Sequence, residues 1–197
     1  MKKGFNVISM GSPSYPALLH QLPDPPPVLY VSGTLDSDTH NIAMVGSRNA
    51  THYGLSMANQ LSMDLATKGF TIVSGMAIGV DTASHMGAID GGGKTIAVLG
   101  SGLSRIYPAK NKKLFHMISE NGAVISEFPL FTEPEPHNFP IRNRIIAGMS
   151  LGTVVVEATK KSGSLITARL AGEQGREVFA VPGSIQSFKS MGTHSLL

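Results

Sequence analysis

The sequence predicts an α/β fold of the extended Rossmann type, doubly wound, with a mostly parallel sheet and helices on both faces. From residue 41 onward, short runs rich in Val, Ile and Ala recur, and a glycine or an acidic residue follows each run within two residues. These runs are apolar without strict alternation, which is typical of strands that are covered on both faces. Segments with helical periodicity separate the runs, and strands that alternate with helices indicate parallel β-α-β units.

The elements are expected in a regular order along the chain. Before residue 41 the pattern is weak: residues 15–19 could begin a short helix, prolines 25–27 break it, and residues 28–31 could form a short strand. The predicted core strands are residues 42–45, 70–73, 95–99, 123–125, 153–156 and 178–181, and the predicted helices are residues 53–68, 81–90, 110–121, 142–149 and 165–174.

Composition limits the possible classes of function. With Lys+Arg 16 against Asp+Glu 13, the net charge is only +3, so affinity for nucleic acid has to come from local clustering of charge. The chain has no cysteine, which excludes disulfides and thiolate metal sites. No run approaches the roughly 20 apolar residues that a membrane helix needs, and the amino terminus has no apolar signal region. We therefore expect a soluble, cytoplasmic protein that does not bind membranes.

The segment 139–147 carries the strongest signal for function. Phe139, Arg142, Asn143 and Arg144 surround Pro140, a residue tolerated in the first turn of a helix. Arginines near a helix N-terminus suit phosphate oxygens, because guanidinium and free N–H groups both donate to anions. An aromatic ring beside paired arginines is what single-stranded nucleic acid uses for base stacking and phosphate contact. A buried Phe139 that only anchors its loop is the alternative, and the sequence leaves both open.

Two strand-end loops are expected beside this segment. Gly46, Ser47 and Arg48 follow the first core strand, where a phosphate loop normally sits in such folds. This loop lacks the further glycines of a dinucleotide fingerprint, so no nucleotide cofactor is predicted. The turn at 162–167 offers hydroxyl and N–H groups to a second anion, and the residues concerned, together with an arginine on the helix that follows, are Gly163, Ser164, Thr167 and Arg169.

Three further ionisable residues have open roles. Asp81 and His85 are four residues apart and would share a helix face, as a metal or acid–base pair could. Asp81 is also well placed as a helix N-cap, and no other ligand cluster accompanies the pair, so a structural role is favoured and no metal is predicted. Glu157 at a strand end is either a general base or a partner for an arginine.

Taken together, the motifs resemble the DprA/Smf family of DNA-processing proteins. The resemblance covers residues 41–195, and the motifs occur in the family's order at 45–48, 74–81, 93–100, 139–146, 162–169 and 175–183. It implies a Rossmann core that binds single-stranded DNA, protects incoming DNA, forms a homodimer and helps to load the RecA recombinase during natural transformation. Members are not known as enzymes. The implied DNA pocket consists of the strand-end loop at 46–48, Phe139, residues 142–144 and the turn at 163–167.

The sequence departs from the family pattern at two places. Pro136 and His137 stand where some relatives carry a lysine just ahead of the motif's phenylalanine, which removes one phosphate contact. Residues 1–40 are expected to be a remnant of an amino-terminal helical extension, and residues 41–197 the Rossmann-like DNA-binding core. No winged-helix domain is expected after Leu197.

An enzyme is the alternative function. Phosphoribohydrolases are nucleotide-processing Rossmann enzymes that cleave a base from a nucleotide with an acid and an arginine, and Glu157 and Arg142 would be the candidates here. Their Pro-Gly-Gly-x-Gly-Thr-x-x-Glu motif is absent, because Pro182 and Gly183 are followed by Ser184. The sequence therefore favours a binding protein with no catalytic residues.

Overall fold

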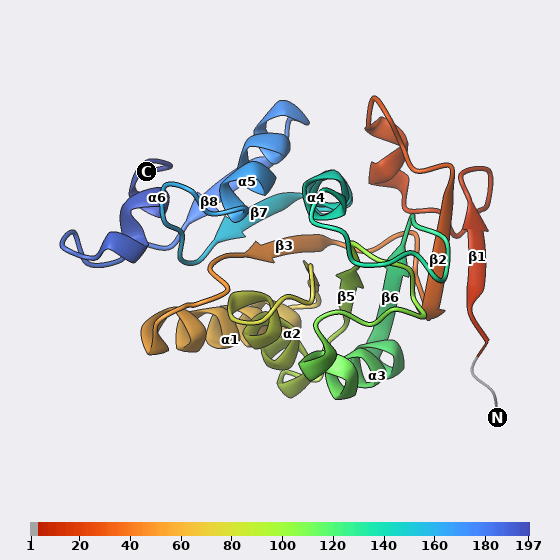
Figure 1. Cartoon of the computed structure of the whole chain (residues 1–197), viewed down its shortest axis with the longest axis horizontal. Helices are drawn as coiled ribbons and strands as arrows, with labels where there is room; N and C mark the ends of the chain where they lie inside the picture. Colours follow the sequence, from red (N-terminus) through yellow and green to blue (C-terminus); the bar gives the residue numbers. More distant parts are fainter. Residues whose placement is uncertain (1–3) are drawn as a thin grey trace.

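The computed structural model describes residues 4–197, and its strands form one eight-stranded sheet (Figure 1). The strands lie in the order β1-β2-β6-β5-β4-β3-β7-β8. β1 and β2 pair antiparallel, as do β2 and β6, and all other neighbours are parallel. Their bounds are β1 Asn6–Ser9, β2 Val28–Gly33, β3 Asn41–Val45, β4 Thr71–Ser74, β5 Thr95–Val98, β6 Gly122–Ser126, β7 Gly152–Val155 and β8 Glu177–Ala180.

Helices cover both faces of the sheet. One face carries α1 (His52–Thr67), α2 (Val80–Asp90) and α3 (Lys112–Asn121), and the other carries α4 (Asn138–Gly148) and α5 (Ser164–Glu173), as Figure 1 shows. The predicted fold class, a doubly wound and mostly parallel sheet, is confirmed. The remaining short helices are the 3-10 turns η1 (Ala17–Gln21), η2 (Ala109–Asn111) and η3 (Phe188–Ser190), and α6 (Met191–His194).

The core fills the space between the sheet and each helical layer. Under α4, Ile145, Ile146 and Met149 pack with Leu19 of η1 against the strands. Under α1 and α2, the buried helix side chains are mostly small, among them Ala58, Ala66 and Ala88, and they pack against Met44 and Ile72 of the strands. The central strands are buried on both sides, and this explains why their sequences do not alternate.

Some predicted elements differ from the structure. α4 begins at Asn138 and not at 142, because Pro140 is the third residue of the helix, where a missing N–H costs no intrahelical bond. The helix predicted from 110 begins at Lys112, after the η2 turn. β1 was not predicted, because its residues are mostly exposed and only its pairing with β2 defines it as a strand.

Residues ahead of β3 join the same sheet as the core. β2 pairs with β6, with Tyr30 opposite Ser126, and β1 forms the outer edge. This segment therefore extends the sheet in the structure. Its origin as a remnant of a longer helical extension stays a prediction.

The topology creates a crevice between β3 and β7. β3 lies next to β4 on one side and β7 on the other, and the helices that follow β3 and β7, α1 and α5, lie on opposite faces (Figure 1). Loops that leave the carboxyl ends of these two strands therefore diverge, which opens a space where ligands bind in such sheets. Within residues 4–197, none of the helices has the length and apolar character needed to cross a bilayer.

Candidate functional site

A cleft of about 670 Å³ opens at the carboxyl ends of β3 and β7. Its walls come from the loop after β3, the first turns of α4, the turn before α5 and the segments around Tyr107 and Pro134. Most of the predicted site residues meet there. Those that line the cleft are Gly46, Ser47, Arg48, Phe139, Arg142, Asn143, Gly163, Ser164 and Thr167.

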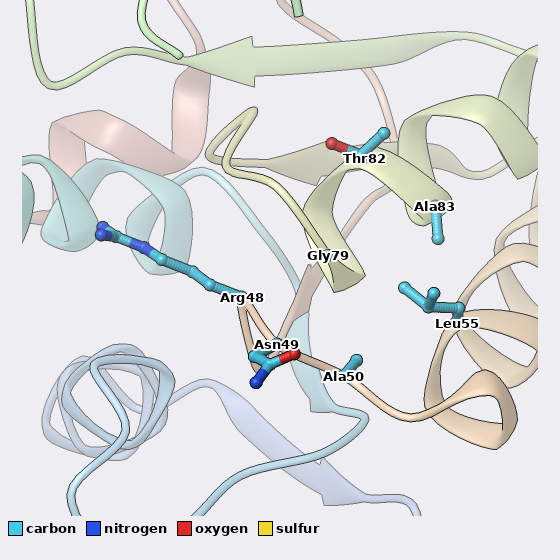
Figure 2. A pocket seen from close by; sticks show the side chains of 7 residues that line it. All are labelled: Arg48, Asn49, Ala50, Leu55, Gly79, Thr82 and Ala83. Carbon is cyan, nitrogen blue, oxygen red and sulfur yellow. The ribbon is translucent and has the colours of Figure 1, made fainter. Parts of the chain in front are cut away.

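The loop after β3 is held by its contact with the start of α2. Gly79 has φ 85°, and a Cβ at this position would lie 2.3 Å from the Ser47 carbonyl oxygen, so only glycine allows the approach. Val80 N–H donates to the same carbonyl at 3.2 Å. The anchored backbone leaves the Arg48 side chain exposed, and it extends away from Leu55 and Ala83 (Figure 2).

Phe139 lies at the centre of an aromatic and cationic cluster. The guanidinium carbon of Arg48 is 5.4 Å from the ring centroid and that of Arg142 is 5.8 Å from it. The ring of Tyr107 is 5.7 Å away, tilted by 47°. Phe139 is half-buried and lines the cleft, so its ring both supports the two guanidinium groups and faces the open space.

Arg142 is buried, with only 4% of its surface exposed. Its Nη1 donates to the carbonyl oxygens of Gly75, at 3.1 Å, and of Val98, and its Nε donates to Asn143 Oδ1 at 3.2 Å. Burial lowers the pKa of Arg142 to about 10, although the nearby Asp81 opposes this shift. The group is therefore cationic at neutral pH, and it ties α4 to the ends of β4 and β5.

Asp81 lies next to Arg142, beside Gly75. Its carboxylate accepts hydrogen bonds from the N–H groups of Gly75 and Ala77, both at 3.2 Å. Burial raises the pKa of Asp81, and the charge of Arg142 acts in the opposite direction. Asp81 is not the N-cap of α2, which is Gly79, because the helix begins one residue before Asp81.

The start of α5 supplies a polar wall. Ser164 and Thr167 line the cleft and are buried, with 8% and 1% of their surfaces exposed. The Ser164 hydroxyl has no hydrogen-bond partner within the described residues 4–197. A buried, unpaired hydroxyl at a helix N-terminus is suited to an anionic oxygen, because the helix dipole and the free N–H groups act in the same direction.

Two of the predicted arginines lie outside the cleft. Arg144 points to the amino-terminal segment, where it pairs with Glu127 at 2.6 Å and Asp24 at 3.0 Å. Arg169 is exposed on α5 and lies 3.8 Å from Glu173. Contact of either with a ligand in this cleft stays a prediction, because the ligand would have to extend beyond the cleft walls.

The placement of α4 changes one expectation. Arg142 and Arg144 were expected beside the free N–H groups of a helix start. Since α4 begins at Asn138, both arginines lie beyond its first turn, so the predicted pairing of guanidinium and free backbone N–H groups is wrong at these positions.

Glu157 is engaged away from the cleft. Thr51 N–H donates to both of its oxygens at 3.2 Å, and Thr51 Oγ1 donates to Oε2 at 2.6 Å. Thr51 is the N-cap of α1. Glu157 therefore stabilises the start of α1 and does not line the cleft.

Sequence reasoning missed Tyr107 and Lys161 as cleft residues. Both line the cleft, and Lys161 is exposed there. Lys161 directly precedes the 162–167 turn, a position that could have marked it as a site residue. Tyr107 follows β5 at the carboxyl edge of the sheet, where ligands bind in such folds, so its position could also have marked it as a site residue. No cluster of three acidic or histidine side chains that could hold a metal ion occurs among the described residues.

Comparison with known proteins gives consistent matches. The sequence model of the family described as DNA recombination-mediator protein A matches residues 6–197. The chain is 46% identical to the DNA processing protein DprA of Bacillus subtilis, over 93% of this chain and 63% of that protein. It is 43% identical to Protein Smf of Synechocystis sp., over 100% of this chain and 50% of that protein. The chain thus spans about half to two thirds of these relatives.

Solved structures agree with these matches. The crystal structure of DprA from Streptococcus pneumoniae has a TM-score of 0.93 at 43% identity, covering 98% of this chain and 69% of that one. A structure of DprA from Helicobacter pylori, described for its single-stranded DNA binding mode, has a TM-score of 0.88 at 32% identity, covering 100% of this chain and 89% of that one. A molybdenum cofactor binding protein from Rippkaea orientalis has a TM-score of 0.58 at 19% identity, covering 81% of this chain and 82% of that one, and shares the fold alone.

Proposed function

The chain belongs to the DNA recombination-mediator protein A family, the DprA/Smf DNA-processing proteins, and on this premise we propose that it binds single-stranded DNA in the cleft between β3 and β7. The observation that carries the proposal is the meeting of Arg48, Phe139 and the polar start of α5 around one open space. The single-stranded DNA binding of the Helicobacter pylori relative, whose structure matches this chain along its full length, supports it.

Different residues of the cleft contact different parts of the DNA. Arg48 and Lys161 are exposed cations and take backbone phosphates, as does the Ser164 hydroxyl at the start of α5. Phe139 provides an aromatic surface for a base. Arg142 mainly supports the cleft wall, because its Nη1 donates to two strand-end carbonyl groups and its Nε to Asn143. Binding of this kind has little sequence preference, because it depends on phosphates and ring faces.

The position of Glu157 supports the proposal of binding without catalysis. The enzyme alternative needs this carboxylate beside the ligand, whereas Thr51 holds it outside the cleft. Release of free base from a panel of nucleoside monophosphates, lost in Glu157→Gln, would contradict this part of the proposal.

The wider role is proposed from the family resemblance. We place the protein in the cytoplasm as a homodimer that protects incoming DNA and helps to load RecA recombinase. Exposed apolar side chains on β8 and the segment after it, Phe179, Ile185 and Phe188, support the homodimer, since such side chains commonly mark contacts between subunits. Light scattering of the wild type and Ile185→Glu tests this assignment, and a monomeric wild type at micromolar concentration would contradict it.

Titration of labelled single strands against salt tests the central proposal. If the protein neutralises Z phosphates, log K should fall against log salt with a slope of about −0.7Z, and Arg48→Ala should flatten that slope by about one phosphate. Lys94→Ala removes the same charge at the amino end of β5, opposite the cleft, and should leave the slope unchanged. Binding that does not depend on salt would refute the proposal.

Arg169→Ala in the same assay tests whether the bound DNA extends beyond the cleft along α5.

A further inference from the structure

Tyr107 places a second aromatic ring in the cleft. It lies between β5 and η2, lines the cleft, and has 45% of its surface exposed. Its ring centroid is 5.7 Å from that of Phe139, with the ring planes tilted by 47°. At this distance the two rings are in contact, and both contribute aromatic surface to the cleft.

The segment that carries Tyr107 is held rigidly. Asn111 Nδ2 donates to the Met76 carbonyl oxygen at 2.8 Å and to Thr82 Oγ1 at 2.9 Å, and the Asn111 side chain is buried. On the other side of Tyr107, Ser101 Oγ donates to the Arg105 carbonyl at 2.7 Å. An exposed ring on a fixed backbone loses little conformational freedom when a ligand binds.

The ring of Phe139 is already in contact with two cations. Its ring already carries the guanidinium groups of Arg48 and Arg142, at 5.4 and 5.8 Å from the centroid. A base that stacks on Phe139 alone has to compete with these cations. No guanidinium or ammonium group lies over the ring of Tyr107 among the described residues, so this ring offers a free surface.

We propose that Tyr107 is a base-contacting residue of the cleft, and that its ring and that of Phe139 together receive one unpaired base while Arg48 takes the adjacent phosphate. The assignment rests on the proposed single-stranded DNA binding. It identifies the ligand at this point as a base and not as a phosphate, so the ring and not the hydroxyl group of Tyr107 carries the interaction.

Binding of two matched strands tests the assignment. One is a labelled oligothymidine, and the other is an abasic deoxyribose-phosphate oligomer of the same length, which keeps the phosphates and lacks the bases. Tyr107→Ala should bind oligothymidine about five- to 150-fold more weakly, the range expected for loss of one base–aromatic stack. The same variant should bind the abasic strand within twofold of the wild type, with an unchanged salt slope. Tyr107→Phe should match the wild type on both strands.

Phe131→Ala is the matched control, because Phe131 is an aromatic residue with 71% of its surface exposed that does not line the cleft. It should leave both affinities unchanged. Tyr107→Leu, which keeps apolar volume without an aromatic face, should weaken oligothymidine binding as Tyr107→Ala does, and it replaces that variant if the alanine protein fails to fold by circular dichroism.

Three results would overturn the assignment: unchanged oligothymidine binding in Tyr107→Ala, an equal loss on both strands, or a Tyr107→Phe protein as weak as Tyr107→Ala. A wild-type protein that binds neither strand would refute the proposed function itself. The failure of the assignment and that of the function are therefore distinguishable.

Discussion

His85 shows how a buried residue can have a defined proton position. Thr95 Oγ1 donates to the Ile72 carbonyl oxygen at 2.8 Å, so toward His85 Nδ1, 2.7 Å away, it can only accept. Nδ1 therefore carries the proton of the neutral ring, and Nε2 has no partner among the described residues. Burial, with a smaller contribution from the charge of Arg142, lowers the pKa of His85 from 6.5 to about 3. His85 is thus packed at the contact between α2 and β5, with Thr95 as the partner of its Nδ1.

This histidine should make the fold sensitive to acid. Between pH 6.5 and about 3 the unfolded chain binds a proton at His85 that the folded chain does not bind, so stability falls as pH falls through this window. From pH 7 to pH 5, His85 should cost about 2 kcal/mol of unfolding free energy. Urea unfolding of wild type and His85→Leu at both pH values measures this difference. An identical pH dependence in the two proteins would contradict the prediction.

Gly75 is needed where Arg142 meets Asp81. A Cβ at Gly75 would lie 2.7 Å from Arg142 Nη2 and 2.9 Å from Asp81 Oδ2. Gly75→Ala should therefore lower the free energy of unfolding by about 1–3 kcal/mol, as overpacking of a buried site does. Gly172→Ala is the control, because nothing lies within 4 Å of a Cβ in that part of α5, and it should gain up to about 1 kcal/mol. Denaturant unfolding of both variants checks the contrast, and equal stabilities would refute it.

At the scale of elements, the two arginines of α4 face different parts of the molecule because of their positions along the helix. Phe139 and Arg142 are three residues apart and share a helix face, so both reach the cleft. Arg144 lies two residues beyond Arg142 and faces Glu127 and the amino-terminal segment instead. Ile145 and Ile146 continue the helix into the core. α4 thus contributes residues to the cleft, to a structural ion pair and to the core.

The start of α1 depends on an acid from another strand end. Glu157→Gln should weaken the cap at Thr51 and lower the free energy of unfolding by about 1 kcal/mol, with unchanged affinity of the folded protein for single-stranded DNA. Glu173→Gln, on the exposed surface of α5, should stay within about 0.5 kcal/mol of the wild type. Denaturant unfolding and strand titration are the measurements. A large loss of DNA affinity at unchanged stability would place Glu157 in the binding site after all.

At the scale of the whole molecule, Arg144 joins three parts of the fold. Its guanidinium pairs with Glu127 after β6 and with Asp24 before β2, and its carbonyl accepts from Gln174 Nε2 at 3.3 Å. The side chains of Arg144 and Glu127 are 15% and 14% exposed, so the pair is largely shielded from water. This contact attaches the amino-terminal strands to the core.

Removing Arg144 should therefore destabilise the whole domain. Arg144→Met leaves the Glu127 carboxylate without its partner and should cost about 1–3 kcal/mol. Burial raises the pKa of Glu127 and Arg144 opposes this, so the pKa should rise further in the variant. A folded pKa above the unfolded value makes stability fall with rising pH, so the loss should be larger at pH 8 than at pH 5. Urea unfolding at both pH values tests this.

The double variant Arg144→Met/Glu127→Gln provides the control. Because the neutral amide needs no cationic partner, it should recover part of the loss at pH 8 and have a weaker pH dependence. A double variant whose losses are simply additive would show that the pair does not act as a unit.

Local sequence patterns were sufficient to predict most of the fold. The core strands and helices were located to within a few residues, because apolar runs, glycines and prolines act on the chain close to where they stand. The same patterns placed Arg48, Phe139 and residues 163–167 at the carboxyl edge of the sheet. β1 escaped prediction, because four mostly exposed residues become a strand only by pairing with β2.

The sequence by itself therefore determined the parallel α/β class, the family resemblance and the loops of the candidate site. Only the tertiary structure decided the strand order, the burial of Arg142, the pairing of Arg144 away from the cleft and the entry of Tyr107 and Lys161 into the cleft. The reason is physical: side-chain direction depends on helix register and on contacts between residues distant in the chain, which no local pattern contains.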